Sequence, residues 1–164
     1  MALSPTEPRK ILVVRPRAAG DVLLATPVLR ALRERFPSAW ISFAVRRNMT
    51  PLVVENPHAS EILVMDAHED RAIPLPRRLA MRARFFAGLR SARFDWAIDL
   101  HGGPRSAFVV FVSGARSRVG YDTRGRRYAF THRVPRFLLD ADGKSVVRPA
   151  VRVNAAMLEP LGIA

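Results

Sequence analysis

The chain has 164 residues, 49% of them hydrophobic, which is enough for one compact domain with an apolar core and too little for two ordinary domains. The chain has 27 lysine and arginine residues and 14 acidic residues, and all but two of the basic residues are arginines. Because arginine binds carboxylates and phosphates through bidentate hydrogen bonds, we expect an acidic partner. The absence of cysteine excludes disulfides, thiolate metal sites and a cysteine nucleophile, and no apolar run approaches the roughly 20 residues of a membrane-spanning helix.

Apolar runs of strand length alternate along the chain with amphipathic segments of helical length. This alternation predicts an α/β fold, a Rossmann-like parallel sheet with helices on both faces, in a single domain over residues 1–164. The predicted strands are Ile11–Arg15, Trp40–Val45, Glu61–Met65, Trp96–Leu100 and, with a weaker signal, Arg118–Tyr121. Helices are predicted in the longer segments between them and over Pro104–Ser113 and Pro149–Leu161.

The first predicted strand runs through a short glycine-containing turn into a helix. This arrangement places Gly20 and Asp21 at the carboxyl edge of the sheet, where open α/β folds bind ligands. The helix extends to about Phe36, and Pro27 leaves two interpretations: either Thr26 caps a helix with Pro27 in its first position, or a helix from Asp21 is kinked there. Asp21 itself can cap the helix or act as a base on a bound substrate.

The segment before the fourth predicted strand combines apolar residues at helical spacing with many arginines. The apolar positions are Leu75, Leu79, Phe86 and Leu89, and the arginines are Arg77, Arg78, Arg82, Arg84, Arg90 and Arg93. Two interpretations of this pattern stand side by side. One is a surface helix that buries its apolar stripe and leaves the arginines in solvent, and the other is a basic amphipathic helix at an anionic membrane surface.

The fourth predicted strand leads into a second turn, residues 99–106. If the first and fourth strands are neighbours, as in the common doubly wound order, this turn and the Gly20–Asp21 turn face one crevice. Asp99 either bonds its own turn or contacts a ligand, and His101 is either a turn residue or a ligand contact. Arg105 stands in the first turn of a helix, where an arginine opposes the helix dipole, so a nearby anion explains it better.

Several familiar chemistries lack their sequence signature. The first predicted strand is followed neither by the Gly-x-Gly-x-x-Gly of dinucleotide-binding folds nor by a P-loop, and no Gly-x-Ser-x-Gly elbow is present. The spacing of the four histidines does not match a metal site. We therefore expect no metal and no bound cofactor in this chain.

Six segments, in this order and spacing, are similar to the N-terminal half of the glycosyltransferase family 9 enzymes, the ADP-heptose:lipopolysaccharide heptosyltransferases. They are Lys10–Arg15, Gly20–Leu32, Asn56–His58, Phe94–Gly102, Arg118–Tyr121 and Leu158–Gly162. The resemblance implies the GT-B architecture, in which two Rossmann-type domains face each other across a cleft. The N-terminal domain then holds mainly the acceptor, the C-terminal domain holds mainly the nucleotide sugar, and this chain supplies the acceptor-binding half without the donor-binding domain.

The resemblance also implies roles for individual residues. Asp21 matches the family aspartate that acts as general base on the acceptor hydroxyl, and Gly20 lets the backbone approach the reacting sugars. Arg15 and Arg105 match basic positions after the first and fourth strands that suit acidic sugars or phosphates. The remaining residues expected to bind the acceptor are Arg17, His101 and Arg152.

The implied function is the transfer of a heptose or related sugar from a nucleotide sugar, ADP-heptose in the family, to an anionic inner-core glycolipid. No signal peptide is visible, so we expect a cytoplasmic protein, with a peripheral place at the inner face of the bacterial inner membrane as a further expectation. Two alternatives are a stand-alone, catalytically silent acceptor-binding domain and a basic nucleic-acid-binding module. The second rests on the net charge of +13 and on the arginine-rich segment before the fourth predicted strand, and no recognised nucleic-acid-binding motif accompanies them.

Overall fold

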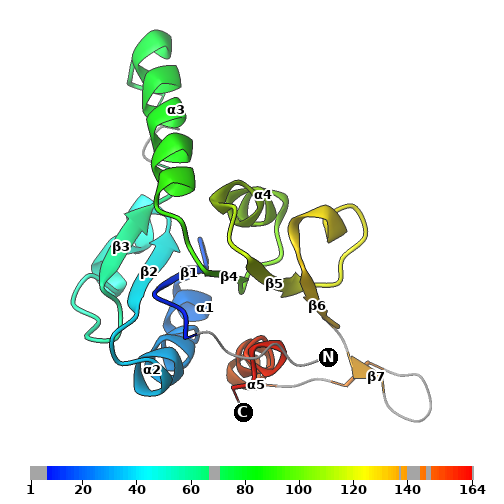
Figure 1. The fold of residues 1–164 in the computed structure, drawn as a ribbon. Coiled ribbons are helices and arrows are strands. Elements are labelled where there is room, and N and C mark those ends of the chain that lie inside the picture. Colours follow the sequence, from blue (N-terminus) through cyan, green and yellow to red (C-terminus); the bar gives the residue numbers. More distant parts are fainter. Residues whose placement is uncertain (1–6, 67–70, 137, 140–144, 147–148, 164) are drawn as a thin grey trace.

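A six-stranded parallel sheet forms the centre of the protein (Figure 1). The structure is a computed structural model that describes residues 7–66, 71–136, 138–139, 145–146 and 149–163. The strands are β1 (Lys10–Val14), β2 (Trp40–Val45), β3 (Glu61–Val64), β4 (Trp96–Asp99), β5 (Ser117–Tyr121) and β6 (His132–Val134). Their order in the sheet is β3-β2-β1-β4-β5-β6, so β1 and β4 are neighbours and the doubly wound order is confirmed.

All five predicted strands are present, with ends that match the prediction or differ from it by one residue. β6 was not predicted from the sequence. It is only three residues long, and Val134 is its one apolar residue, so it lacks the hydrophobic run that identifies the other strands. Its place at the sheet edge follows from pairing with β5, where Tyr121 lies opposite Val134.

Helices cover both faces of the sheet and bury two separate cores (Figure 1). On one face lie α1 (Ala19–Leu23), α2 (Thr26–Arg35), α5 (Ala150–Ala155) and the 3-10 helix η4 (Glu159–Leu161). On the other lie α3 (Leu75–Ser91), α4 (Pro104–Ser113) and η3 (Arg127–Ala129). The remaining elements are η1 (Arg47–Leu52), which follows β2, and an antiparallel pair, β7 (Leu138–Leu139) with β8 (Ser145–Val146).

The predicted helix from Asp21 to Phe36 is two helices, and neither interpretation of Pro27 holds as stated. Leu24 and Ala25 separate α1 from α2, and Thr26 is the first residue of α2 and not its cap. Pro27 follows within the first turn, where its missing N–H costs no helical hydrogen bond. The Thr26 hydroxyl donates to the Leu23 carbonyl at 2.8 Å and ties the two helices together.

The predicted last helix is likewise divided. It is helical over α5, continues through a turn, and ends in η4 with Gly162 in the left-handed conformation expected of a helix stop. Pro160 lies inside this region and cannot donate a backbone hydrogen bond to the preceding turn, which accounts for the break.

α3 packs against the rest of the protein only at its C-terminal end. Leu89 is buried there, whereas Leu75 and Leu79 at the other end are each 55% exposed. The N-terminal part of α3 projects beyond the two helical layers (Figure 1). The prediction of a continuous buried apolar stripe is therefore wrong for the first half of this helix.

Candidate functional site

Two turns meet at the carboxyl edge of the sheet. Val14, the last residue of β1, lies opposite Asp99, the last residue of β4, and the Leu100 N–H donates to the Val14 carbonyl at 3.0 Å. The turn after β1 leads into α1, and the turn after β4 leads into α4. Residues that are 85 positions apart in the sequence are thereby brought into contact, which confirms the predicted meeting of the two turns.

Asp21 is held at this edge by an ion pair. Its Oδ2 lies 2.6 Å from Nη2 of Arg15, whose other terminal nitrogen donates to the Leu100 carbonyl. The Arg15 side chain is 12% exposed and that of Asp21 is 44% exposed, so a nearly buried guanidinium anchors a carboxylate that solvent and ligands can reach. The capping alternative is wrong, because Ala18 is the N-cap residue of α1 and no side chain caps this helix.

Asp99 organises the second turn. It is fully buried, and its Oδ1 accepts the backbone N–H groups of His101 and Gly102 at 2.9 Å, while its Oδ2 accepts the Ser106 hydroxyl at 2.9 Å. Burial raises the pKa of Asp99 to about 6, against the opposing effect of these hydrogen bonds and of the Arg15 charge. Of the two interpretations of Asp99, the structure shows the one in which it bonds its own turn.

His101 lies between the two turns and is half-buried. Burial lowers its pKa, and the positive charges of Arg15, Arg17 and Arg136 lower it further, while Asp21 acts in the opposite direction. The imidazole is therefore neutral near pH 7 and presents one donor and one acceptor. A Cβ at Gly103 would lie 2.7 Å from the His101 ring, so glycine at that position makes room for the ring.

Tyr121, at the end of β5, belongs to the same group although it was not predicted as a site residue. Its ring packs against Gly102, where a Cβ would lie 2.7 Å from the ring and φ is +69°. The Arg136 guanidinium lies over the same ring, 5.7 Å from its centroid. Burial raises the pKa of the Tyr121 hydroxyl, and the Arg15 charge opposes that rise. Its position at a strand end beside two glycine-containing turns is the sequence signal that could have identified it.

A groove of about 1080 Å³ opens beside this edge, between α3, the start of α4 and the loops that follow β1, β2 and β3. Its polar lining is almost entirely basic: Arg17, Arg46, Arg71, Arg78, Arg82 and Arg105. Among the described residues of the lining, Asp66 is the one acidic side chain, and its carboxylate accepts hydrogen bonds from Nε of Arg46 at 3.0 Å and from the Arg47 N–H at 2.7 Å. Burial alone would raise the pKa of Asp66, but these two partners lower it overall.

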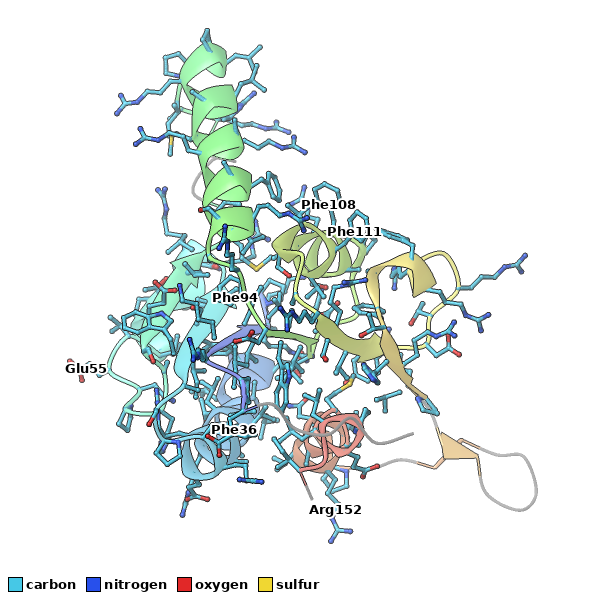
Figure 2. All side chains as sticks on the ribbon, viewed as in Figure 1. Phe36, Glu55, Phe94, Phe108, Phe111 and Arg152 are labelled. Carbon is cyan, nitrogen blue, oxygen red and sulfur yellow. The ribbon has the colours of Figure 1, made fainter. Side chains whose placement is uncertain are left out.

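The other predicted site residues divide into two groups. Arg17 and Arg105 line the groove together with His101, and Gly20 lies in α1 with open space where a side chain would be. Arg152 lies on α5, on the same face of the sheet as α1, and is not part of the groove lining (Figure 2). The groove lining thus includes Arg17, His101 and Arg105, whereas Arg15 and Asp21 are paired at the sheet edge and Arg152 lies apart from the groove.

Part of the chain matches the model of a known protein family. The model of glycosyltransferase family 9 (heptosyltransferase) matches residues 82–159. A relative from Escherichia coli, lipopolysaccharide heptosyltransferase 3, is 27% identical over 147 residues that cover 90% of this chain. The chain is thus similar to glycosyltransferase family 9 over most of its length. It spans less than half the length of the curated relatives that it matches, 41% of this enzyme and 45% of lipopolysaccharide heptosyltransferase 2 from E. coli K12.

Solved structures of the family share the fold. The structure of a family 9 glycosyltransferase from Veillonella parvula superposes on this chain with a TM-score of 0.73 and 22% sequence identity. The match covers 95% of this chain and 42% of the Veillonella chain. The structure of E. coli heptosyltransferase WaaC with ADP-2-deoxy-2-fluoro heptose superposes with a TM-score of 0.70 and 18% sequence identity. The match covers 94% of this chain and 49% of the WaaC chain. The Rossmann-like sheet therefore has the same fold as the matched halves of these structures.

Proposed function

We propose that this chain is the acceptor-binding half of a heptosyltransferase-type glycosyltransferase. The reaction transfers a heptose or related sugar from a nucleotide sugar to an anionic inner-core glycolipid. The observation that carries the proposal is the Asp21 carboxylate, held by Arg15 at the sheet edge and 44% exposed beside a groove lined by arginines. An exposed carboxylate at such an edge is available to a substrate and has no structural partner other than Arg15 among the contacts described for it.

The chemistry assigned to Asp21 is general-base catalysis. A hydroxyl of the acceptor attacks the anomeric carbon of the donor, the bond from that carbon to the nucleoside diphosphate breaks, and the hydroxyl proton passes to the Asp21 carboxylate. Arg15 fixes the position of the carboxylate, because its guanidinium is bound at the same time to the Leu100 carbonyl. Proton transfer needs this precision, since the carboxylate must lie within hydrogen-bond distance of the attacking hydroxyl.

The groove suits an acceptor that is both acidic and partly apolar. Arg17 and Arg105 line the groove together with His101, and their guanidinium groups can bind phosphates or sugar carboxylates through bidentate hydrogen bonds. Phe85 and Phe86 line the same groove at α3 and offer an apolar wall. Glycolipids with acidic headgroups combine these properties, and a protein that uses one works at the surface of the membrane that contains it.

The nucleotide-sugar donor is assigned to residues outside these 164. The relative WaaC was solved with an ADP-heptose analogue, and the present chain matches only 49% of it. ADP-heptose is thus the donor that we propose for the complete enzyme, with no metal ion required of this chain. Within the described residues, no three histidine or acidic side chains gather as a metal site would require.

Replacing Asp21 by asparagine tests the proposal. The chain is joined to the C-terminal half of a family 9 relative, and transfer from ADP-heptose is measured with saturating acceptor. Asp21→Asn keeps the shape and much of the hydrogen bonding but cannot accept the proton, so turnover should fall roughly 100-fold or more while acceptor affinity changes little.

Glu34→Gln is the matched control. It removes another arginine-paired carboxylate, bound to Nε of Arg30 at 2.7 Å on the exposed surface of α2, far from the groove. Turnover of this variant should stay at the wild-type level. Near-normal turnover of Asp21→Asn would show that Asp21 is not the base and would favour a catalytically silent binding role.

A further inference from the structure

A second recess lies at the edge of the sheet opposite to the one that carries Asp21. The helices α3 and α4 end shortly before β4 and β5 begin, so the C-termini of both helices lie near the amino ends of these strands. The recess between them has a volume of about 540 Å³, and we call it the amino-edge recess. It is lined by Arg90, Phe111, Val112, Gly114 and Arg118, none of which lines the arginine-rich groove.

Gly114 lets the Arg90 guanidinium lie directly against the backbone of the recess. It ends α4 in the left-handed conformation, with φ at +65°, as is common for glycine after a helix. A Cβ at this position would also overlap the Arg90 guanidinium. Both the backbone angle and the space therefore require glycine, and the end of the Arg90 side chain has a defined place in the recess.

Arg118 is held in the recess by the backbone and not by an acidic side chain. Its Nε donates to the Ala129 carbonyl at 2.7 Å, and its Nη1 donates to the Ala115 carbonyl at 2.8 Å. These two bonds use only part of the five N–H groups of a guanidinium. Because the side chain is already fixed, little conformational entropy would be lost when its remaining N–H groups bind a ligand.

The charge of the recess is positive. Within the described part of the chain, no carboxylate pairs with Arg90 or Arg118. The C-termini of α3 and α4 each carry about half a negative charge, so two guanidinium groups leave an excess of about one positive charge. Like charges that line one recess repel each other, and a bound anion would remove that repulsion.

An aromatic ring completes the recess. Phe111, labelled on α4 in Figure 2, is 45% exposed, and its ring packs edge-to-face against Tyr128 of η3 with centroids 5.4 Å apart. This contact orients the Phe111 ring, and Val112 adds aliphatic surface beside it. Phenyl rings and guanidinium groups both stack on planar rings. The lining therefore suits a ligand that combines a negative charge with a planar ring.

We propose that the amino-edge recess binds a small planar anion, namely an aromatic ring that carries a phosphate, as in a nucleoside monophosphate. The phosphate accepts hydrogen bonds from Arg90 and Arg118, and the ring stacks on Phe111. The volume of about 540 Å³ lies in the range of small-molecule sites. This inference does not rest on the proposed function, because the recess and Asp21 lie at opposite edges of the sheet.

Nuclear magnetic resonance of the ¹⁵N-labelled chain tests the site. Adenosine monophosphate is titrated in one series, and adenosine and inorganic phosphate in two others. The backbone amide of Gly114 reports on the recess and that of Gly103 on the groove. Adenosine monophosphate should shift the Gly114 signal saturably, with a Kd roughly tenfold or more below that of either half alone, because both the charge and the ring are recognised.

Single substitutions locate the two contacts. Arg90→Gln and Phe111→Leu should each weaken the binding of adenosine monophosphate by roughly tenfold. Arg84→Gln is the control for charge, because it removes an arginine of the same helix that lines neither the recess nor the groove. Phe108→Leu is the control for the ring, on the same helix as Phe111 but in the groove lining. Both controls should bind like the wild type, and melting temperatures check that all four variants are folded.

Several results would overturn the proposal. One is an unshifted Gly114 signal at adenosine monophosphate concentrations up to about 5 mM, where even a millimolar Kd gives high occupancy. A shift confined to Gly103 would place the nucleotide in the groove, and equal affinities for phosphate and adenosine monophosphate would contradict a role for the ring. Asp21→Asn should bind adenosine monophosphate like the wild type, so a failure of the catalytic assignment leaves this test intact.

Discussion

The buried carboxylate of Asp99 fixes the conformation of the turn after β4, but its negative charge lowers the stability of the folded protein. It holds the turn of His101 and Gly102 through three hydrogen bonds, yet its ionised form is costly in the interior. Because burial raises the pKa of Asp99 to about 6, above its ordinary value of 3.8, the folded protein binds this proton more tightly than the unfolded chain does. Its contribution to stability is therefore greatest below about pH 4 and is lost as pH rises through about 6.

Substitution of Asp99 makes this contribution measurable. Asp99→Asn keeps an acceptor for the two N–H groups and removes the charge, so the free energy of unfolding at pH 7.5 should stay the same or rise by up to about 2 kcal/mol. Asp99→Ala leaves those N–H groups and the Ser106 hydroxyl unpaired and should cost about 2–3 kcal/mol. Urea unfolding at pH 4.5 and 7.5 measures both. An Asp99→Asn variant with the same pH dependence as the wild type would contradict the assignment.

At the scale of the element, α3 is anchored at one end and exposed at the other. Leu89 lies in the core with Phe94 and Ala107, whereas Leu79 is 55% exposed. Leu89→Ala should lower the free energy of unfolding by about 2–4 kcal/mol, because it leaves a cavity between helix and sheet. Leu79→Ala should change it by less than about 0.5 kcal/mol. Chemical denaturation compares the two, and equal losses would show that the projecting end of α3 is packed in solution.

At the scale of the whole molecule, the sheet order decides where ligands bind. The order of strands reverses between the parallel neighbours β1 and β4, because β2 and β3 are added on one side of β1 and β4, β5 and β6 on the other. Both site turns lie at that point, which is the usual ligand crevice of an open α/β sheet. The present chain contains this crevice and the arginine-lined groove beside it. Among the helices that the structure describes, none combines the length and the hydrophobicity of a membrane span.

This arrangement leads to a prediction about the chain as a whole. By itself it should bind an anionic inner-core glycolipid, with an affinity that falls as salt rises, because the six groove arginines provide most of the attraction. It should not transfer heptose from ADP-heptose, since the proposed donor residues lie outside it. Calorimetric titration at two salt concentrations measures the first, and a transfer assay measures the second. Steady-state transfer by this chain alone would contradict the division of roles.

Much of the site follows from the order of residues along the chain. Gly20 and Asp21 follow a buried strand after a short turn, and Asp99 to Arg105 lie at the end of another strand and in the turn after it. Both turns therefore had to lie at the carboxyl edge of a parallel sheet. Apolar runs identified five strands because burial on both faces of a parallel sheet requires continuous hydrophobic sequence. The short β6, with one apolar residue, carries no such signal.

The sequence by itself therefore determined the fold class, the five longer strands and the position of both site turns, since these depend on local hydrophobic pattern and on strand ends. Only the tertiary structure decided that Asp21 pairs with Arg15 and does not cap α1, and that Tyr121 packs beside Gly102. It also decided that Leu75 and Leu79 stay exposed. Periodicity shows that a helix has an apolar side, but only the packing of distant segments determines whether that side is covered.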